Sequence, residues 1–294
     1  MTRPFRFGLG KLEIPGDAAQ WEKTSREVES QGYDVLLVPD HLGRTAPFPP
    51  LVATAAVTGL RVGTLVLNSG FYHPPLLARD IATVDRLTGG RLEVGLGTGY
   101  VHEEFAALGL DPGSPKDRVD ALERTVLALR QILGDPESVP AAVQQPVPLL
   151  IAGNGNRVLR LAAEHADIAG FIGMRYDPTA LGGLRLIPTA ELAERVAYFD
   201  DVVGGRSDRV ERNLLLQAVI VTEDRDAAIR QVAATQLPVP LEELEQTPLL
   251  LIGTVGQIID RVRELRDLYG FSYFTVMDIH QEAFAPVVEA LSGS

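Results

Sequence analysis

Residues 62–96 read VGTLVLNSGFYHPPLLARDIATVDRLTGGRLEVGL and are predicted to form a strand, a helix and a second strand. The apolar runs Val62–Leu67 and Leu92–Leu96 have the length of buried strands. Between them, a helix is predicted to begin at Pro74, because the proline ring suits the first helical turn, and to end before Gly89 and Gly90, which permit a left-handed stop. This alternation is typical of parallel sheets.

The same alternation extends along the whole chain and predicts eight strands. They are Phe5–Gly10, Val35–Val38, Val62–Leu67, Leu92–Leu96, Leu149–Ala152, Ile168–Phe171, Leu214–Val221 and Phe271–Met277. Asp17, Ser114 and Thr254 are predicted helix N-caps, and Gly32 and Gly270 are predicted helix ends. These local signals support the division into helices and strands.

Eight parallel strands can form either an open doubly wound sheet or a closed barrel. The open sheet usually carries a glycine fingerprint after its first strand, and Gly10-Lys11-Leu12-Glu13 has none. We therefore predict an α/β fold, a (β/α)8 TIM barrel, forming a single domain over residues 1–294. Gly173–Pro188 and Pro238–Leu251 are longer than ordinary connections and are predicted to be loop insertions at the C-terminal face, over the barrel mouth.

Composition favours a small molecule as the binding partner. The net charge of −12 repels nucleic acid and anionic lipid, so we expect neither nucleic-acid nor membrane binding. The chain has no cysteine, so any redox chemistry must come from a bound cofactor. The N-terminus shows no secretory signal, and no apolar run is long enough to span a bilayer, so a cytoplasmic location is expected.

Asp40 and His41 follow the second predicted strand, at the end of the barrel where reacting groups usually lie. His41 is a candidate proton donor or acceptor. The alternative is that Asp40 caps a turn and His41 is a surface histidine. After the third strand, Asn68 is the better candidate ligand, because its amide can both donate to and accept from a heterocycle, whereas His73 is interpreted as a loop residue before a helix.

Glycines concentrate after the fourth strand, in Gly95-Leu96-Gly97-Thr98-Gly99-Tyr100. A dinucleotide fingerprint would need glycine where Tyr100 stands. Backbone amides at Gly97, Thr98 and Gly99 can instead approach a planar or anionic ligand closely, because glycine has no side chain. The alternative is that these glycines only ease packing between strand and helix.

The fifth strand is followed by Gly153-Asn154-Gly155-Asn156-Arg157 and then a helix. Free amides at a helix N-terminus favour a phosphate, and Arg157 and Arg160 add positive charge. This turn is therefore a candidate phosphate site, with a Gly/Asn turn and N-cap as the alternative. The motifs of zinc proteases, Walker loops and serine hydrolases are missing, and the histidines lack ligand spacing, so no metal site is predicted.

In their order along the chain, these segments resemble the luciferase-like family of flavin and deazaflavin oxidoreductases. The resemblance is carried by Pro39-Asp40-His41, His73-Pro74, Leu87-Thr88-Gly89-Gly90-Arg91-Leu92, Gly95-Leu96-Gly97-Thr98-Gly99-Tyr100, Glu103-Glu104-Phe105, Leu108-Gly109, Gly153-Asn154-Gly155, Leu161-Ala162-Ala163, Ala166-Asp167-Ile168 and Ile252-Gly253-Thr254. It covers almost the whole chain. It implies a barrel that is commonly a homodimer, with the cofactor ring across the mouth.

The resemblance also implies a non-prolyl cis peptide bond in or just after the third strand, where Thr64, Leu65 and Val66 would support the cofactor ring. The sequence looks closest to the branch that uses the deazaflavin coenzyme F420. Hydride would then pass between reduced deazaflavin and a small organic substrate, with His41 handling the proton and Asp40 orienting His41 or binding the cofactor. The cofactor's phosphate would lie near Gly153–Asn156 and Arg157.

Three alternatives to this function remain at the sequence level. The first is an FMN-dependent monooxygenase, and the others are a barrel that binds flavin without catalysis and a lyase or isomerase that binds a phosphorylated substrate. The sugar-phosphate dehydrogenases of the family carry an aromatic residue after the histidine and a carboxylate after the glycines. Leu42-Gly43-Arg44-Thr45 and Tyr100 stand there instead. A sugar phosphate is therefore not the expected substrate.

Overall fold

Eight parallel strands close into a barrel in the computed structural model, which describes residues 3–14, 16–138, 140–177, 183–235 and 241–294. The barrel strands are β1 (Arg6–Gly10), β2 (Val35–Val38), β3 (Arg61–Thr64), β5 (Leu92–Gly97), β6 (Leu149–Ala152), β7 (Ile168–Phe171), β10 (Glu211–Leu215) and β13 (Phe271–Met277). Their order is β3-β2-β1-β13-β10-β7-β6-β5, and pairing of β3 with β5 closes the ring. The predicted (β/α)8 fold is confirmed.

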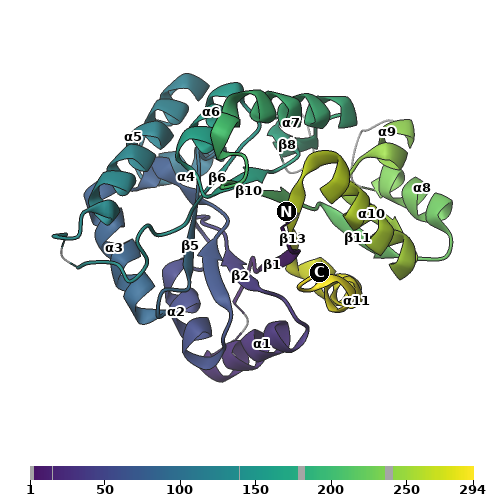
Figure 1. Ribbon diagram of the computed structural model, residues 1–294, viewed down its shortest axis with the longest axis horizontal. Coiled ribbons are helices and arrows are strands. Elements are labelled where there is room, and N and C mark those ends of the chain that lie inside the picture. The colour runs from purple at the N-terminus through teal and green to yellow at the C-terminus, as the bar shows by residue number, and fades with distance from the viewer. Residues whose placement is uncertain (1–2, 15, 139, 178–182, 236–240) are drawn as a thin grey trace.

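Helices surround the barrel as an outer ring (Figure 1), apart from the short α4 (His102–Ala107), which contacts His41 at the C-terminal rim. The helices of the ring are α1 (Ala18–Ser30), α2 (Phe48–Val57), α3 (Pro74–Leu87), α5 (Pro115–Gly134), α6 (Asn156–His165), α7 (Thr189–Val203), α8 (Arg225–Thr235), α9 (Leu241–Gln246), α10 (Val255–Tyr269) and α11 (Gln281–Leu291). Asp17, Ser114 and Thr254 each cap a helix as predicted, the last two in capping boxes. Gly270 ends α10 in the left-handed conformation.

The hydrophobic core has two parts because neighbouring residues of a strand point to opposite faces. Alternate residues of the strands pack outward against the helices, as Leu36 and Ile151 do. The other alternate residues fill the inside of the barrel. This inner cluster consists of Val35, Leu37, Leu150, Ala152, Ile168 and Tyr273, with the partly buried Leu65, Val66 and Ile172 packed against it.

Two predicted strands are each divided in the structure. The run Val62–Leu67 forms β3 and, after a break, the short β4 (Leu67–Asn68). The peptide bond between Leu65 and Val66 at this break is cis, which confirms the cis bond expected there.

The run Leu214–Val221 was wrongly predicted as one strand. It forms β10 and β11 (Ala218–Val221), because the chain changes hydrogen-bonding partner between them.

The change of partner is visible in two consecutive amides. The amide of Leu216 donates to Thr275 of the barrel, whereas the amide of Gln217 donates to Leu249 outside it. From there β11 pairs with β12 (Leu250–Gly253), a strand that the sequence did not predict, since its first residues fell within the predicted insertion Pro238–Leu251. Pro238–Pro240 lie outside the described residues, and the rest of that stretch forms α9 at the outer ring beside α8 and enters β12 (Figure 1).

The insertion Gly173–Pro188 is a β-hairpin. Its strands β8 (Met174–Tyr176) and β9 (Leu184–Leu186) are antiparallel, and residues 178–182 between them lie outside the described residues. Because the hairpin follows the C-terminal end of β7, it stands at the barrel mouth. In the described part of the chain, no helix is long and apolar enough to cross a membrane.

Candidate active site

The candidate site residues gather at one end of the barrel. All strands of the barrel are parallel, so the segments that follow β2 and β6 lie at the same C-terminal rim. His41 and the Gly153 turn therefore share this rim. Lys11 and Asp278 continue it, since an ion pair of 3.5 Å joins their side chains just after β1 and β13.

His41 is held at the rim by a carboxylate. Its Nδ1 lies 2.8 Å from Oε1 of Glu104, in the first turn of α4. The carboxylate accepts the Nδ1 proton, which leaves Nε2 as the nitrogen that can take up or release a proton at the mouth. The His41 side chain is 29% exposed and that of Glu104 is 13% exposed. The pair is therefore largely shielded from solvent, while part of the imidazole stays accessible to a ligand. This geometry suits general acid–base chemistry.

Asp40 points to the loop after β4. Its Oδ2 accepts hydrogen bonds from the amide of Asn68 at 3.1 Å and from the hydroxyl of Tyr72 at 3.0 Å. Burial raises the pKa of Asp40, against the lowering effect of these two hydrogen bonds. The contacts of Asp40 thus fix the rim between β2 and β4, and the structure does not bring its carboxylate into a hydrogen bond with His41.

Asn68 and Gly99 lie in close contact at the rim, after β4 and β5. Asn68 is buried, and its Oδ1 accepts from the amide of Gly70 at 3.0 Å. Gly99 has a φ of +67°, and a Cβ added there would lie 2.2 Å from Nδ2 of Asn68. Only glycine fits this position, because the backbone is left-handed and the space is taken by the amide.

The floor of the mouth is apolar. Leu65 and Val66 are partly exposed and lie against the inner cluster of the barrel. Thr64 is buried below them, where its hydroxyl donates to the carbonyl of Gly95 and accepts from the amide of Gly95. A Cβ on Gly97 would come within 2.7 Å of Cγ2 of Val66. Gly95 and Gly97 therefore let β5 approach this floor, which supports the packing interpretation for these two glycines.

The turn before α6 contains an unpaired polar atom. The amide group of Asn154 donates to the carbonyl of Met174 at 2.6 Å, while its Oδ1 is buried without a hydrogen-bond partner. Gly155 is the N-cap of α6, and the space around its Cα is open. Free amides of the first helical turn and an unpaired carbonyl oxygen suit a ligand that carries both an anionic group and a hydroxyl.

The arginines near this turn are arranged differently from the prediction. Arg157 forms ion pairs with Asp120 at 2.7 Å and Glu123 at 2.9 Å on α5. Arg195 of α7 instead donates to Oδ1 of Asn156 at 2.6 Å. The first residue of α6 is thus contacted by a positive charge from a helix about 40 residues further along the chain, which no local motif indicated.

Aromatic rings line the rim from His41 to the hairpin. The ring of Tyr100 is edge-on to His41 at 6.0 Å and tilted to Tyr176 at 6.4 Å. Tyr176 in turn stacks on His102 at 5.8 Å and 23°. We call these four residues the aromatic wall. Burial, with a further contribution from the Glu104 carboxylate, raises the pKa of Tyr100, so its hydroxyl stays protonated.

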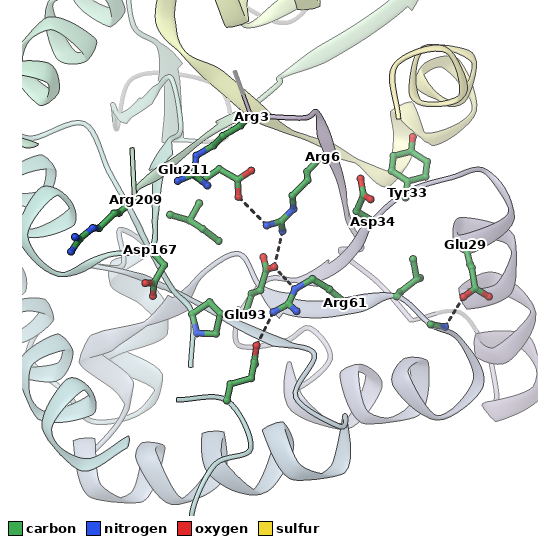
Figure 2. A pocket seen from close by; sticks show the side chains of 15 residues that line it. Arg3, Arg6, Glu29, Tyr33, Asp34, Arg61, Glu93, Asp167, Arg209 and Glu211 are labelled. Atoms are coloured by element: carbon green, nitrogen blue, oxygen red, sulfur yellow. Dashed lines mark hydrogen bonds and ion pairs between the residues drawn. The ribbon is translucent and has the colours of Figure 1, made fainter. Parts of the chain in front are cut away.

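A cavity with a volume of about 750 Å³ lies at the other end of the barrel, among the N-terminal ends of the strands. Figure 2 shows Arg6 between Glu93 and Glu211, with Arg61 on the same Glu93 carboxylate. Burial raises the pKa of Glu211. Residues at the N-terminal ends of barrel strands generally stabilise the fold, so this network is assigned to stability.

Sequence reasoning missed three side chains of the rim: Glu104 as the partner of His41, Tyr72 as the partner of Asp40, and Arg195. Glu104 stands in the segment that carried the family resemblance, although nothing in it indicated a contact with a histidine 63 positions away. Among the described residues, no group of three or more histidine or carboxylate side chains is arranged to hold a metal ion.

Comparison with known proteins places this geometry in context. Residues 4–271 match the family model described as luciferase-like monooxygenase. An F420-dependent glucose-6-phosphate dehydrogenase of Amycolatopsis mediterranei is 31% identical over 54% of this chain and 53% of its own length. The enzyme of the same description from Nakamurella multipartita is 27% identical over 77% of this chain and 71% of its own length. A pyrimidine monooxygenase of Cronobacter turicensis is 29% identical over 76% of this chain and 56% of its own length. The matched part thus spans only about half of some relatives.

Solved structures agree on the fold. A structure of an F420-dependent secondary alcohol dehydrogenase with an F420–acetone adduct has a TM-score of 0.75 at 16% identity, covering 98% of this chain and 99% of that chain. A riboflavin lyase structure with modified FMN has a TM-score of 0.74 at 13% identity, covering 99% of this chain and 93% of that chain. At such identities the likeness supports the barrel alone.

Proposed function

Because the chain belongs to the luciferase-like monooxygenase family, we propose that it is an oxidoreductase that uses the deazaflavin F420 to transfer hydride to or from a small organic substrate. Family membership makes the protein an oxidoreductase with a flavin or deazaflavin cofactor. The choice of F420 is supported by relatives such as the Amycolatopsis and Nakamurella enzymes, which bear that name.

The residues of the rim fit such a cofactor. The partly exposed side chains of Leu65 and Val66 offer an apolar surface for a tricyclic ring. The unpaired Oδ1 of Asn154 fits a hydroxyl of the side chain that links ring and phosphate. The N-terminus of α6 and Arg195 fit the phosphate. Bound there, F420 would supply a carbon that donates or accepts hydride.

Gly97, Thr98, Gly99 and Tyr100 complete the proposed cofactor contacts on the side of β5. Thr98 and Tyr100 are partly exposed at the rim, so their atoms are available to a ligand. Gly97 and Gly99 act through their small size, which allows β5 and its following turn to lie close to Val66 and Asn68. Thr98 and Tyr100 are therefore proposed to contact the cofactor directly, whereas Gly97 and Gly99 are proposed to shape the site by lacking side chains.

The observation that carries the proposal is the pair His41–Glu104 beside an apolar floor. Glu104 holds the proton on Nδ1 of His41, so Nε2 can give a proton to the substrate, or take one from it, as hydride moves. His41 is therefore proposed as the catalytic residue and Glu104 as its positioning residue. The apolar floor excludes water from one side of the reacting centre.

An FMN-dependent monooxygenase is the second candidate. It is favoured by the similarity to the pyrimidine monooxygenase of Cronobacter turicensis, which is comparable to the similarity to the F420 enzymes. The same apolar floor and the same histidine would serve a flavin. The two candidates differ in cofactor and in the use of oxygen.

Equilibrium binding of oxidised F420 and of FMN to the purified protein tests the proposal. We expect F420 to bind more tightly, and the reduced protein–F420 complex to be oxidised by substrate at the same rate with and without oxygen. Tight binding of FMN together with uptake of oxygen would overturn the assignment in favour of the monooxygenase. Binding of a phosphorylated compound without either cofactor would favour a lyase or isomerase.

A homodimer is proposed as the assembly. Helices α3 and α5 pack against each other and carry exposed leucines. Leu76, Leu87 and Leu127 are 54%, 63% and 45% exposed. These side chains give an apolar surface for a second copy of the chain to cover. Light scattering should give twice the mass of one chain, and a single-chain mass would contradict the proposal.

A further inference from the structure

The aromatic wall has no explanation in the packing of the core. Its four rings come from three separate segments: His41 follows β2, Tyr100 and His102 follow β5, and Tyr176 belongs to β8 of the hairpin. Consecutive rings are 5.8 to 6.4 Å apart, so they form one continuous row. The row begins at the proposed catalytic imidazole and ends at the insertion over the mouth.

The outer end of the wall, formed by Tyr176 and His102, is exposed to solvent, unlike the aromatic pairs of the core. Phe171 and Phe199, for example, pack edge to face at 5.7 Å and are both 0% exposed. Tyr176 is 46% exposed, and His102 is also exposed. Aromatic surface left in water is unfavourable, and a flat ligand that covers it would recover that free energy.

We propose that the aromatic wall is the substrate subsite, with Tyr100 shared between the substrate and the cofactor contacts proposed above, and that it takes a planar, conjugated ring with a polar substituent directed to His41. Aromatic rings attract other flat rings in stacked and edge-to-face arrangements at the centroid distances seen within the wall. A saturated ring is puckered and cannot make these contacts. The inference rests on the proposed function, because it uses His41 as the group that acts on the substrate.

Charge at the wall favours a neutral ring over an anionic one. The carboxylate of Glu104 lies beside His41 and affects Tyr100 as well, so a second negative charge here would be repelled. The protonated hydroxyl of Tyr100 can donate to a carbonyl or ring nitrogen. These features distinguish the expected substrate from a sugar phosphate, which is both puckered and doubly charged.

The test compares naphthol with decalol, its fully hydrogenated counterpart, as probes of binding. Both are neutral alcohols with the same carbon skeleton, and only naphthol is flat. Affinities are measured by calorimetry for the free protein and for the protein saturated with its preferred cofactor. We expect naphthol to bind about fivefold or more tightly than decalol, as one or two aromatic contacts would give.

Three variants identify the wall as the source of this preference. Tyr176→Leu should weaken it, because one of the four rings is lost, whereas Tyr176→Phe should keep it. Tyr269→Leu is the matched control, since this tyrosine packs on Phe271 at the N-terminal end of β13 and not at the mouth. All three variants are compared with the wild type by thermal unfolding, so that a loss of folding is recognised.

Equal affinity for the two probes would overturn the inference, as would a preference that is as large in Tyr176→Leu as in the wild type. A Tyr176→Leu variant that binds its cofactor less tightly but keeps the preference for naphthol would assign the wall to the cofactor, which also overturns it. If neither F420 nor FMN binds, the proposed function fails, and the naphthol preference of the free protein still decides whether the wall binds flat rings.

Discussion

Nδ1 of His41 and Oε1 of Glu104 lie 2.8 Å apart although the two residues are 63 positions apart in the chain. The contact exists because β2 and the turn after β5 end at the same rim of the barrel. It determines which nitrogen of His41 carries the proton, and the chemistry of the site depends on that choice.

His41→Ala should slow oxidation of the reduced cofactor by substrate by about 100-fold to 10,000-fold, the usual contribution of a general acid or base. Glu104→Gln keeps a hydrogen-bond acceptor without charge and should cost less, with KM nearly unchanged. Nitrogen NMR of the imidazole checks the cause: the wild type should carry the proton on Nδ1, and Glu104→Ala should lose this preference. A tautomer that is unaffected by Glu104→Ala would contradict the positioning role.

Asp40 should make the protein less stable as the pH rises. Burial raises the folded-state pKa of Asp40 above its ordinary value of 3.8, so the folded protein holds this proton more tightly than the unfolded chain does. The contribution of Asp40 to the free energy of unfolding is therefore greatest below pH 3.8, and it falls as the pH rises through the folded-state pKa. Above that pKa the contribution is constant.

Asp40→Asn removes this titration while retaining an oxygen that can accept from Asn68 and Tyr72. Urea unfolding at several pH values above 3.8 should give a flatter curve of stability against pH than the wild type gives. Asp40→Ala should instead destabilise the protein by about 1–3 kcal/mol for each of the two donors left unpaired. Parallel pH curves for Asp40→Asn and the wild type would count against the raised pKa.

The barrel could be predicted from the sequence because its strands are signalled locally. Val35–Val38 and Ile168–Phe171 are apolar runs whose bounds agree with β2 and β7. The division of Leu214–Val221 could not be predicted, since all but one of its residues are apolar and only the hydrogen-bond partner changes, from Thr275 to Leu249. A change of partner is a tertiary event, and Gln217, the one polar residue of the run, does not by itself indicate it.

The site could be predicted less completely, for a related reason. His41 and the turn at Gly153 were found because the ends of barrel strands are known to hold function. The direction of a side chain on a helix was not accessible: Arg157 faces Asp120 and Glu123 of α5, and Arg195 reaches Asn156. Which arginine lies at the α6 N-terminus depends on how three helices pack, and no sequence pattern near Gly155 contains that information.

Arg6 should matter for stability and not for cofactor binding. Its guanidinium contacts Glu93 at 2.6 Å and Glu211 at 2.9 Å, and both carboxylates are buried. Arg6→Met leaves two buried negative charges without this partner and should destabilise the protein by about 3–5 kcal/mol. The control is Arg79→Met, which breaks an exposed pair with Asp80 and should cost less than about 1 kcal/mol.

Urea unfolding measures both Arg variants, and equilibrium binding of the cofactor is measured on the folded protein. Affinity should not change in either variant, because Arg6 lies at the N-terminal end of β1 and the proposed cofactor site is at the C-terminal rim. A loss of cofactor affinity in folded Arg6→Met would show that the network of Figure 2 influences the mouth.

Arg195 and Arg157 offer the sharpest test of where the cofactor phosphate lies. Both are arginines near the N-terminus of α6, but Arg195 contacts Asn156 at 2.6 Å, whereas Arg157 is engaged with Asp120 and Glu123 on α5. Arg195→Ala should weaken cofactor binding by about 10-fold, as expected for loss of a charged hydrogen bond, and the loss should shrink at high salt. Arg157→Ala, whose charge is already balanced by two carboxylates, should change the affinity less than about twofold. Equal losses in the two variants, or a larger loss for Arg157→Ala, would move the phosphate away from Asn156 and toward the side of α6 that faces α5.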